Sequence, residues 1–140
     1  MQKGSGALSP PDDLDEELLM PAYEAGARVM SNSWGCLPSE EDPDECNVYT
    51  SACREVDRFV WRAQDAVVVF AAGNHLSLSF PATAKNAIAV GASWSLHDPQ
   101  RPDAHLWDLP SFSAAGPTIK DGRIKPDVYA PGVGIASAAA

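Results

Sequence analysis

The chain has 140 residues, of which 45% are hydrophobic and 21% are charged, a composition typical of one globular domain or of a piece of a larger one. Its formal net charge of -9 argues against a surface that binds nucleic acid or anionic lipid, because such surfaces need clustered Lys and Arg. No apolar run reaches the length of a membrane span. Because the chain is acidic, the partners expected are neutral, peptide-like or cationic molecules.

The first predicted element is a helix that runs toward Ala25. Acidic residues at 12–17 place negative charge where the start of a helix favours it, and Leu14 and Leu18 lie one turn apart. A strand at 28–35 follows almost at once, as expected in an α/β unit.

An acidic loop follows this strand. The segment 39–45 combines closely spaced like charges with a proline, and both disfavour regular structure. A solvated surface loop is the favoured interpretation, ahead of a calcium site or a site for basic substrates.

The three cysteines, Cys36, Cys46 and Cys53, form no recognisable motif. Their number is too small and too uneven for a disulfide framework, and they lack the paired spacing of a zinc site. They are either isolated thiols or one disulfide within a loop plus one remaining thiol.

The second predicted helix is the most regular element of the sequence. Apolar residues recur at three- and four-residue steps from Tyr49 to Ala63, with charged residues such as Arg54 and Glu55 between them. This amphipathic helix leads into a continuous apolar stretch at 66–72, which suits a strand buried on both faces.

Two further strands complete the predicted fold. Residues 87–92 repeat the apolar pattern, and residues 127–130 form a short strand within a last third that is rich in turns. Helices and buried strands alternate as they do in a parallel sheet with helices on its faces. The fold class expected is therefore α/β, with a parallel sheet flanked by helices.

A carboxamide lies just beyond the strand at 66–72. Gly73 lets the backbone turn sharply there, and open α/β sheets bind ligands at the carboxyl ends of their strands. Asn74 then supplies an uncharged N–H donor of the kind that stabilises a developing oxyanion. Taken alone, this pattern is more typical of a turn or a cap.

Five segments in order closely resemble successive blocks of the subtilase family, and most nearly its bacterial alkaline serine protease branch. Five ordered blocks are far more specific than any single motif, and the similarity extends from about Leu18 to Ser137. The blocks are Ser31–Gly35, Val67–Asn74, Pro81–Ala92, Phe112–Ser113 with Gly116–Pro117, and Asp121–Gly132.

The resemblance implies a polypeptide substrate and roles for seven residues, with no cofactor required for the chemistry. In this family one strand lines the cleft and pairs with the substrate backbone, and an asparagine that falls on Asn74 forms the oxyanion hole. The implied substrate-binding residues are Ser33, Trp34, Gly35, Ala71, Ala72 and Gly73. For Trp34, core packing and lining of the cleft remain equally open.

The family's catalytic triad is not found in the sequence. Subtilases use Asp, His and Ser in that order, but no Asp or His block precedes Arg28 and no nucleophile block closes the chain. His75, His97 and His105 match no family base. We therefore expect residues 1–140 to be the central part of a single subtilase catalytic domain, without its N-terminal Asp and His blocks and its C-terminal Ser block, and to be inactive alone.

Two functions remain open. The chain is either a segment of a serine endopeptidase or a truncated or degenerate domain that at most binds peptides through residues 33–35. A nucleotide-binding domain is excluded because no glycine-rich phosphate motif follows any strand. Structural calcium is frequent in the family, but no ligand position can be assigned here. The resemblance also makes an extracellular location plausible.

Overall fold

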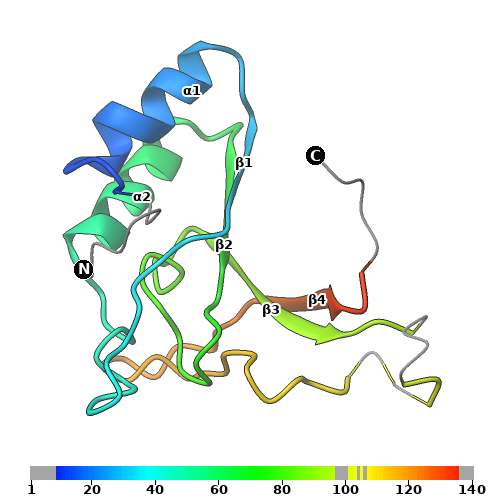
Figure 1. Ribbon diagram of the computed structural model, residues 1–140. Helices are drawn as coiled ribbons and strands as arrows, with labels where there is room; N and C mark the ends of the chain where they lie inside the picture. Colours follow the sequence, from blue (N-terminus) through cyan, green and yellow to red (C-terminus); the bar gives the residue numbers. More distant parts are fainter. Residues whose placement is uncertain (1–8, 97–100, 104, 106, 136–140) are drawn as a thin grey trace.

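The computed structural model describes residues 9–96, 101–103, 105 and 107–135, which form one sheet with two helical segments packed on one side (Figure 1). A π-helical turn, Asp15–Leu19, runs directly into α1, Met20–Glu24. The remaining elements are β1 (Val29–Asn32), α2 (Ser51–Arg62), β2 (Val67–Ala71), β3 (Ile88–Trp94) and β4 (Val128–Val133). Each of these elements was predicted, in this order, from the sequence.

Two elements differ in detail from their predicted form. The single helix expected up to Ala25 is a π-helical turn followed by α1, because Pro21 lies in the first turn of α1 and has no N–H to donate. Strand β4 extends beyond residue 130 through Pro131 to Val133. A proline is tolerated there because β4 is an edge strand of the described sheet.

All four strands of the described sheet are parallel, in the order β1-β2-β3-β4. Asn32 pairs with Phe70, and Ala71 pairs with Val90. Because parallel strands point the same way, their carboxyl ends meet at one edge of the sheet. The α/β fold class is confirmed, and the segments after β1 and β2 begin next to each other.

The hydrophobic core lies between the helices and one face of the sheet. Alternate strand residues, including Met30, Val68 and Phe70, face Val56 and Phe59 of α2, and all five are buried. We expected the strand at 66–72 to be buried on both faces, and this was wrong. No described element covers the second face, so its side chains, among them Val29, Val67, Ile88 and Val128, are exposed.

A buried carboxylate fastens the first helical segment to α2. Asp15 is fully buried, and its Oδ2 accepts hydrogen bonds from Arg58 and Arg62. Arg58 also donates to both carboxylate oxygens of Asp13. The pKa of Asp13 is lowered, first by the backbone N–H of Glu16 and then by Arg58. These contacts fix the helical segment that precedes β1.

Replacement of Arg58 tests this anchor. We expect Arg58→Ala to lower the free energy of unfolding by about 1–3 kcal/mol, since a buried carboxylate loses one of its two cationic partners. Arg54→Ala, at an exposed position on the same helix, is the matched control and should cost less than about 0.5 kcal/mol. Urea unfolding measures both variants, and equal losses would contradict the assignment.

Candidate functional site

The segments that follow β1 and β2 enclose a small cavity of about 120 Å³ at the carboxyl edge of the sheet. Six of the seven residues implicated by the sequence line it: Ser33, Trp34, Gly35, Ala71, Gly73 and Asn74. The seventh, Ala72, is buried with Leu78 and Ala114 behind the strand end. Two blocks separated in sequence by the whole of α2 thus meet at one site.

Asn74 presents an unpaired carboxamide to this site. The residue is exposed, and no hydrogen bond of its side chain is found among the described residues. Its position is fixed by the backbone, since the Ala72 N–H donates to Val90 O (2.9 Å) and the Ala114 N–H donates to Gly73 O (3.2 Å). The backbone that carries Asn74 is therefore held in place, and its side-chain N–H groups are free to bind a ligand.

Gly73 is required by the turn that delivers this carboxamide. Its φ of +131° lies in a region that side chains with a Cβ rarely adopt, and an added Cβ would lie 3.1 Å from Ser77 O. The sequence Ala-Ala-Gly-Asn therefore combines a buried strand end, a left-handed turn and an exposed donor.

Residues 33–35 continue an open edge. Strand β1 pairs only with β2 in the described sheet, and its continuation through Ser33 and Gly35 is exposed. Gly35 lies so close to Ser79 that an added Cβ would be 2.8 Å from the Ser79 Oγ. The edge is thus held against the Ser79–Phe80 segment and leaves its outer side accessible to an added strand.

Trp34 both packs and lines the site. Its ring contacts the buried ring of Phe70 edge-to-face, with centroids 5.3 Å apart, while the residue as a whole is only half-buried. On one side it lines the 120 Å³ cavity, and on the other it lines a second cavity of about 420 Å³. Core packing of Trp34 is therefore confirmed, and its role in a substrate cleft stays a prediction.

The second cavity was not foreseen from the sequence. It is built by four segments that are separated in the chain, with walls that include Leu14, Trp34, Ala52 and Phe80. It also contains Glu55, which the helical pattern placed among the charged residues of α2 but which is only 9% exposed. The helical pattern gave no signal of this burial, because the residue that Glu55 bonds, Leu14, is 41 positions away in the sequence.

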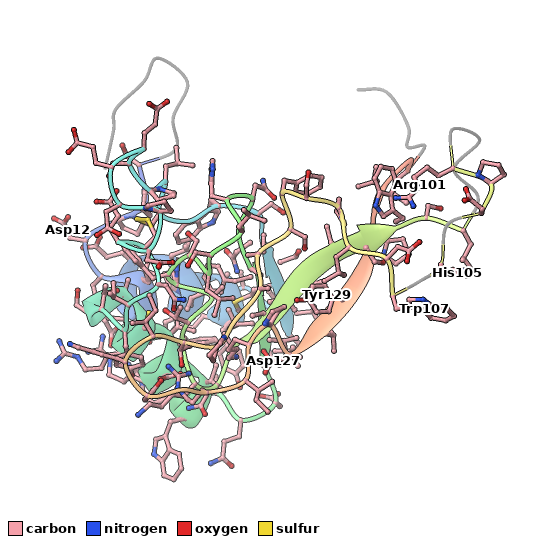
Figure 2. The ribbon with its side chains drawn as sticks, turned by 90° about the horizontal axis from the view of Figure 1, so that it is seen from below. Asp12, Arg101, His105, Trp107, Asp127 and Tyr129 are labelled. Atoms are coloured by element: carbon pink, nitrogen blue, oxygen red, sulfur yellow. A yellow bond between two sulfur atoms is a disulfide. The ribbon has the colours of Figure 1, made fainter. Side chains whose placement is uncertain are left out.

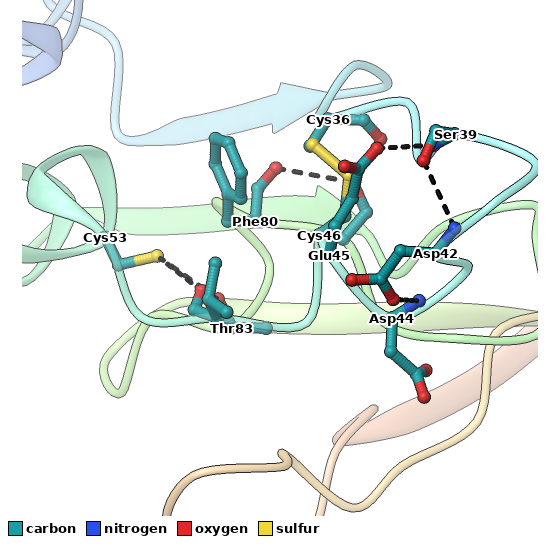
Figure 3. The surroundings of a disulfide bond; sticks show 11 residues. Cys36, Ser39, Asp42, Asp44, Glu45, Cys46, Cys53, Phe80 and Thr83 are labelled. Atoms are coloured by element: carbon teal, nitrogen blue, oxygen red, sulfur yellow. Dashed lines mark hydrogen bonds between the residues drawn. A yellow bond between two sulfur atoms is a disulfide. The ribbon is translucent and has the colours of Figure 1, made fainter.

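A disulfide closes the loop beside the site (Figure 3). Cys36 and Cys46 are bonded, whereas Cys53 is a buried free thiol, so the alternative of one loop disulfide plus one remaining thiol is confirmed. The Cys36 N–H donates to Phe80 O (3.0 Å), and the Phe80 N–H donates to Cys46 O (3.0 Å). The disulfide and these bonds fasten the loop to Phe80, in the wall of the larger cavity.

The acidic loop, 39–45, is exposed throughout, as predicted. It is organised by local bonds, including Asp42 N–H to Ser39 Oγ (3.2 Å) and Asp44 N–H to Asp42 Oδ1 (3.1 Å), which Figure 3 shows. Together with Asn74 and His75, part of this loop borders an outer recess of about 840 Å³. The loop therefore gives the mouth of the site a negative rim.

The described histidines do not assemble a catalytic dyad. His75 is exposed next to Asn74, while His105 stacks on Trp107 in the projecting segment between β3 and β4 (Figure 2). His97 lies outside the described residues.

Within the described part of the chain, no group of three or more potential ligands is placed to hold a metal ion, and no helix is long and apolar enough to span a membrane.

Comparison with known proteins identifies the family. The model of the subtilase family matches residues 6–139. In Dictyostelium discoideum, the serine protease/ABC transporter B family protein tagD is 38% identical over 98 residues, or 68% of this chain. The related protein tagB is 35% identical over 100 residues, or 69% of this chain. Each match covers only 5% of the relative, so the chain spans a small fraction of their length.

A solved structure shares the fold. The prenylagaramide maturation protease PagA matches 81% of this chain and 34% of its own length, with a TM-score of 0.50 and 22% sequence identity. The parallel sheet, the ordered sequence blocks and the match along almost the whole chain agree, and the chain belongs to the subtilase family of serine proteases.

Proposed function

We propose that the full-length protein, meaning this chain with any sequence that flanks it in its gene, is a serine endopeptidase. In this proposal the chain supplies the substrate-binding strand and one donor of the oxyanion hole. The observation that carries the proposal is the exposed, unpaired carboxamide of Asn74 in the same cavity as the open edge at Ser33 and Gly35.

The chemistry follows from this placement. A peptide that adds as a strand along residues 33–35 brings its scissile carbonyl to the cavity at the strand ends. When a serine oxygen bonds to the carbonyl carbon, its proton passes to a general base, and the π electron pair of the C=O bond moves to the carbonyl oxygen, which becomes negative. The Asn74 Nδ2–H donates to that oxygen. Asn74 neither gains nor loses a proton, so its contribution is electrostatic.

The attacking serine and its His and Asp partners come, in this proposal, from parts of the subtilase domain outside residues 1–140. The uncovered face of the sheet supports this. Parallel sheets in α/β proteins are covered on both faces, yet Val29 is 69% exposed and Val128 is 49% exposed. We propose that the remainder of the catalytic domain packs on this face.

The two cavities on either side of Trp34 fit an extended substrate. Both are lined by Trp34, Gly35 and Cys36, so a single peptide along this edge reaches both. We propose that the smaller cavity takes the side chain next to the scissile bond and that the larger one takes a residue farther toward the N-terminus of the substrate.

A peptide-binding domain without catalysis is the alternative, because the edge and both cavities are present without a triad. A fluorophosphonate probe separates the two functions. We expect one serine of the full-length protein to be labelled stoichiometrically and a polypeptide of residues 1–140 to remain unlabelled, since the nucleophile lies elsewhere. Intact-mass spectrometry measures the adduct. Absence of labelling on the full-length protein would favour the non-catalytic function.

Replacement of Asn74 tests the oxyanion donor. Loss of one such donor lowers turnover by about 10²–10³-fold, a magnitude measured in subtilisin itself, and we expect a comparable loss for Asn74→Ala with KM nearly unchanged. Asn86→Ala, at an exposed position away from the cavity, is the matched control and should retain full turnover. A turnover number for Asn74→Ala equal to that of the unmodified protein would remove Asn74 from the mechanism.

A further inference from the structure

The larger cavity behind Trp34 has mainly apolar walls and two carboxyl groups. Its volume is about 420 Å³, and its apolar surface includes Leu14, Trp34 and Phe80. Asp12 and Glu55 are the acidic residues that line it, and none of its lining residues is cationic. Such a cavity fits a side chain with a long apolar stem and a positively charged end.

Glu55 is the central feature of this cavity. The residue is only 9% exposed, and its Oε2 accepts a hydrogen bond from the Leu14 N–H at 3.0 Å. No partner of Oε1 is found among the described residues, and none of their ion pairs involves Glu55. Oε1 is not one of the buried atoms that lack a partner, so it is accessible from the cavity that Glu55 lines, where a cationic group can pair with it.

Two of the three cations of α2 are engaged elsewhere, and the third, Arg54, is exposed and forms no ion pair with Glu55 among the described residues. Arg58 pairs with Asp13 and Asp15, and Arg62 pairs with Asp15 and Glu16. The residue of α2 at the cavity one turn before Glu55 is Ala52, whose small side chain leaves room along the helix. The cavity therefore combines an accessible carboxyl group with space to reach it.

We propose that this cavity selects a lysine or arginine side chain of the peptide substrate, with Glu55 as the residue that determines this specificity. The aliphatic stem lies against Trp34 and Phe80, the cationic end meets Glu55 Oε1, and exposed Asp12 adds negative potential at the rim. This inference rests on the proposed function, because it assigns the chemistry of one residue of the substrate.

Paired peptides measure the selectivity directly. Each pair carries either lysine or norleucine, which has a similar stem without the charge, at one position on the N-terminal side of the cleaved bond. For the full-length protein we expect lysine to raise kcat/KM about tenfold at one position and to have little effect at the others. Equal values for lysine and norleucine at every position would overturn the proposal.

Glu55→Gln separates charge from structure. Glutamine keeps an oxygen that can accept from the Leu14 N–H and has nearly the same shape, so we expect the lysine-to-norleucine ratio to fall to about one through loss of kcat/KM for the lysine peptide. Glu41→Gln, in the exposed acidic loop, removes the same charge and should leave the ratio intact. Equal losses in the two variants would assign the preference to the overall negative field and overturn a specific site.

Two outcomes distinguish failure of the proposed specificity from failure of the proposed protease function. A lower thermal midpoint for Glu55→Gln with an unchanged ratio would show that Glu55 only holds the Leu14 backbone, which overturns the proposal. If the protein cleaves no peptide, the proposed function fails instead. Fluorescence anisotropy with the same peptides then gives the ratio of dissociation constants, and Glu55→Gln must still abolish a lysine preference for the inference to stand.

Discussion

The parallel pairing of β1 with β2 is the constraint on which the rest of the site depends. Because the two strands run in the same direction and Asn32 lies opposite Phe70, the chain leaves both strands at the same edge of the sheet. Helix α2, the connection between them, is packed on one face by a fully buried core that includes Phe59 and Phe70. The donor at Asn74 and the open edge at Ser33 are thereby brought together without any direct contact being needed between their side chains. A change of one residue in this register would separate them.

Local sequence signals were sufficient to predict the helices and strands and most of the residues that line the small cavity. The apolar periodicity of α2 and the β-branched run of β2 are properties of short windows, and the rule that ligands bind at the carboxyl ends of parallel strands placed Asn74 correctly at the edge. The pairing of Cys36 with Cys46 could not be obtained in this way. It depends on a Cα separation of 5.6 Å that the folded loop creates.

The burial of Glu55 could not be predicted from the local sequence. The helical pattern placed it with the charged residues, but the residue that it bonds, Leu14, is 41 positions away and reaches it only in the folded chain. The π-helical turn before α1 has a different origin, since Pro21 removes a donor from an otherwise helical sequence. The apolar pattern of β2 favours a strand buried on both faces, but it does not indicate whether the element that covers each face is part of the same segment.

In the proposed function, these features belong to the part of a subtilase domain that binds and orients a substrate and stabilises the charge developed on its carbonyl oxygen. The most direct test is a crystal structure of the full-length protein with a peptide aldehyde bound at the reactive serine. We expect the peptide backbone to pair with residues 33–35 and the hemiacetal oxygen to lie about 2.7–3.1 Å from Asn74 Nδ2. A peptide bound away from β1, or an oxygen directed away from Asn74, would contradict this expectation.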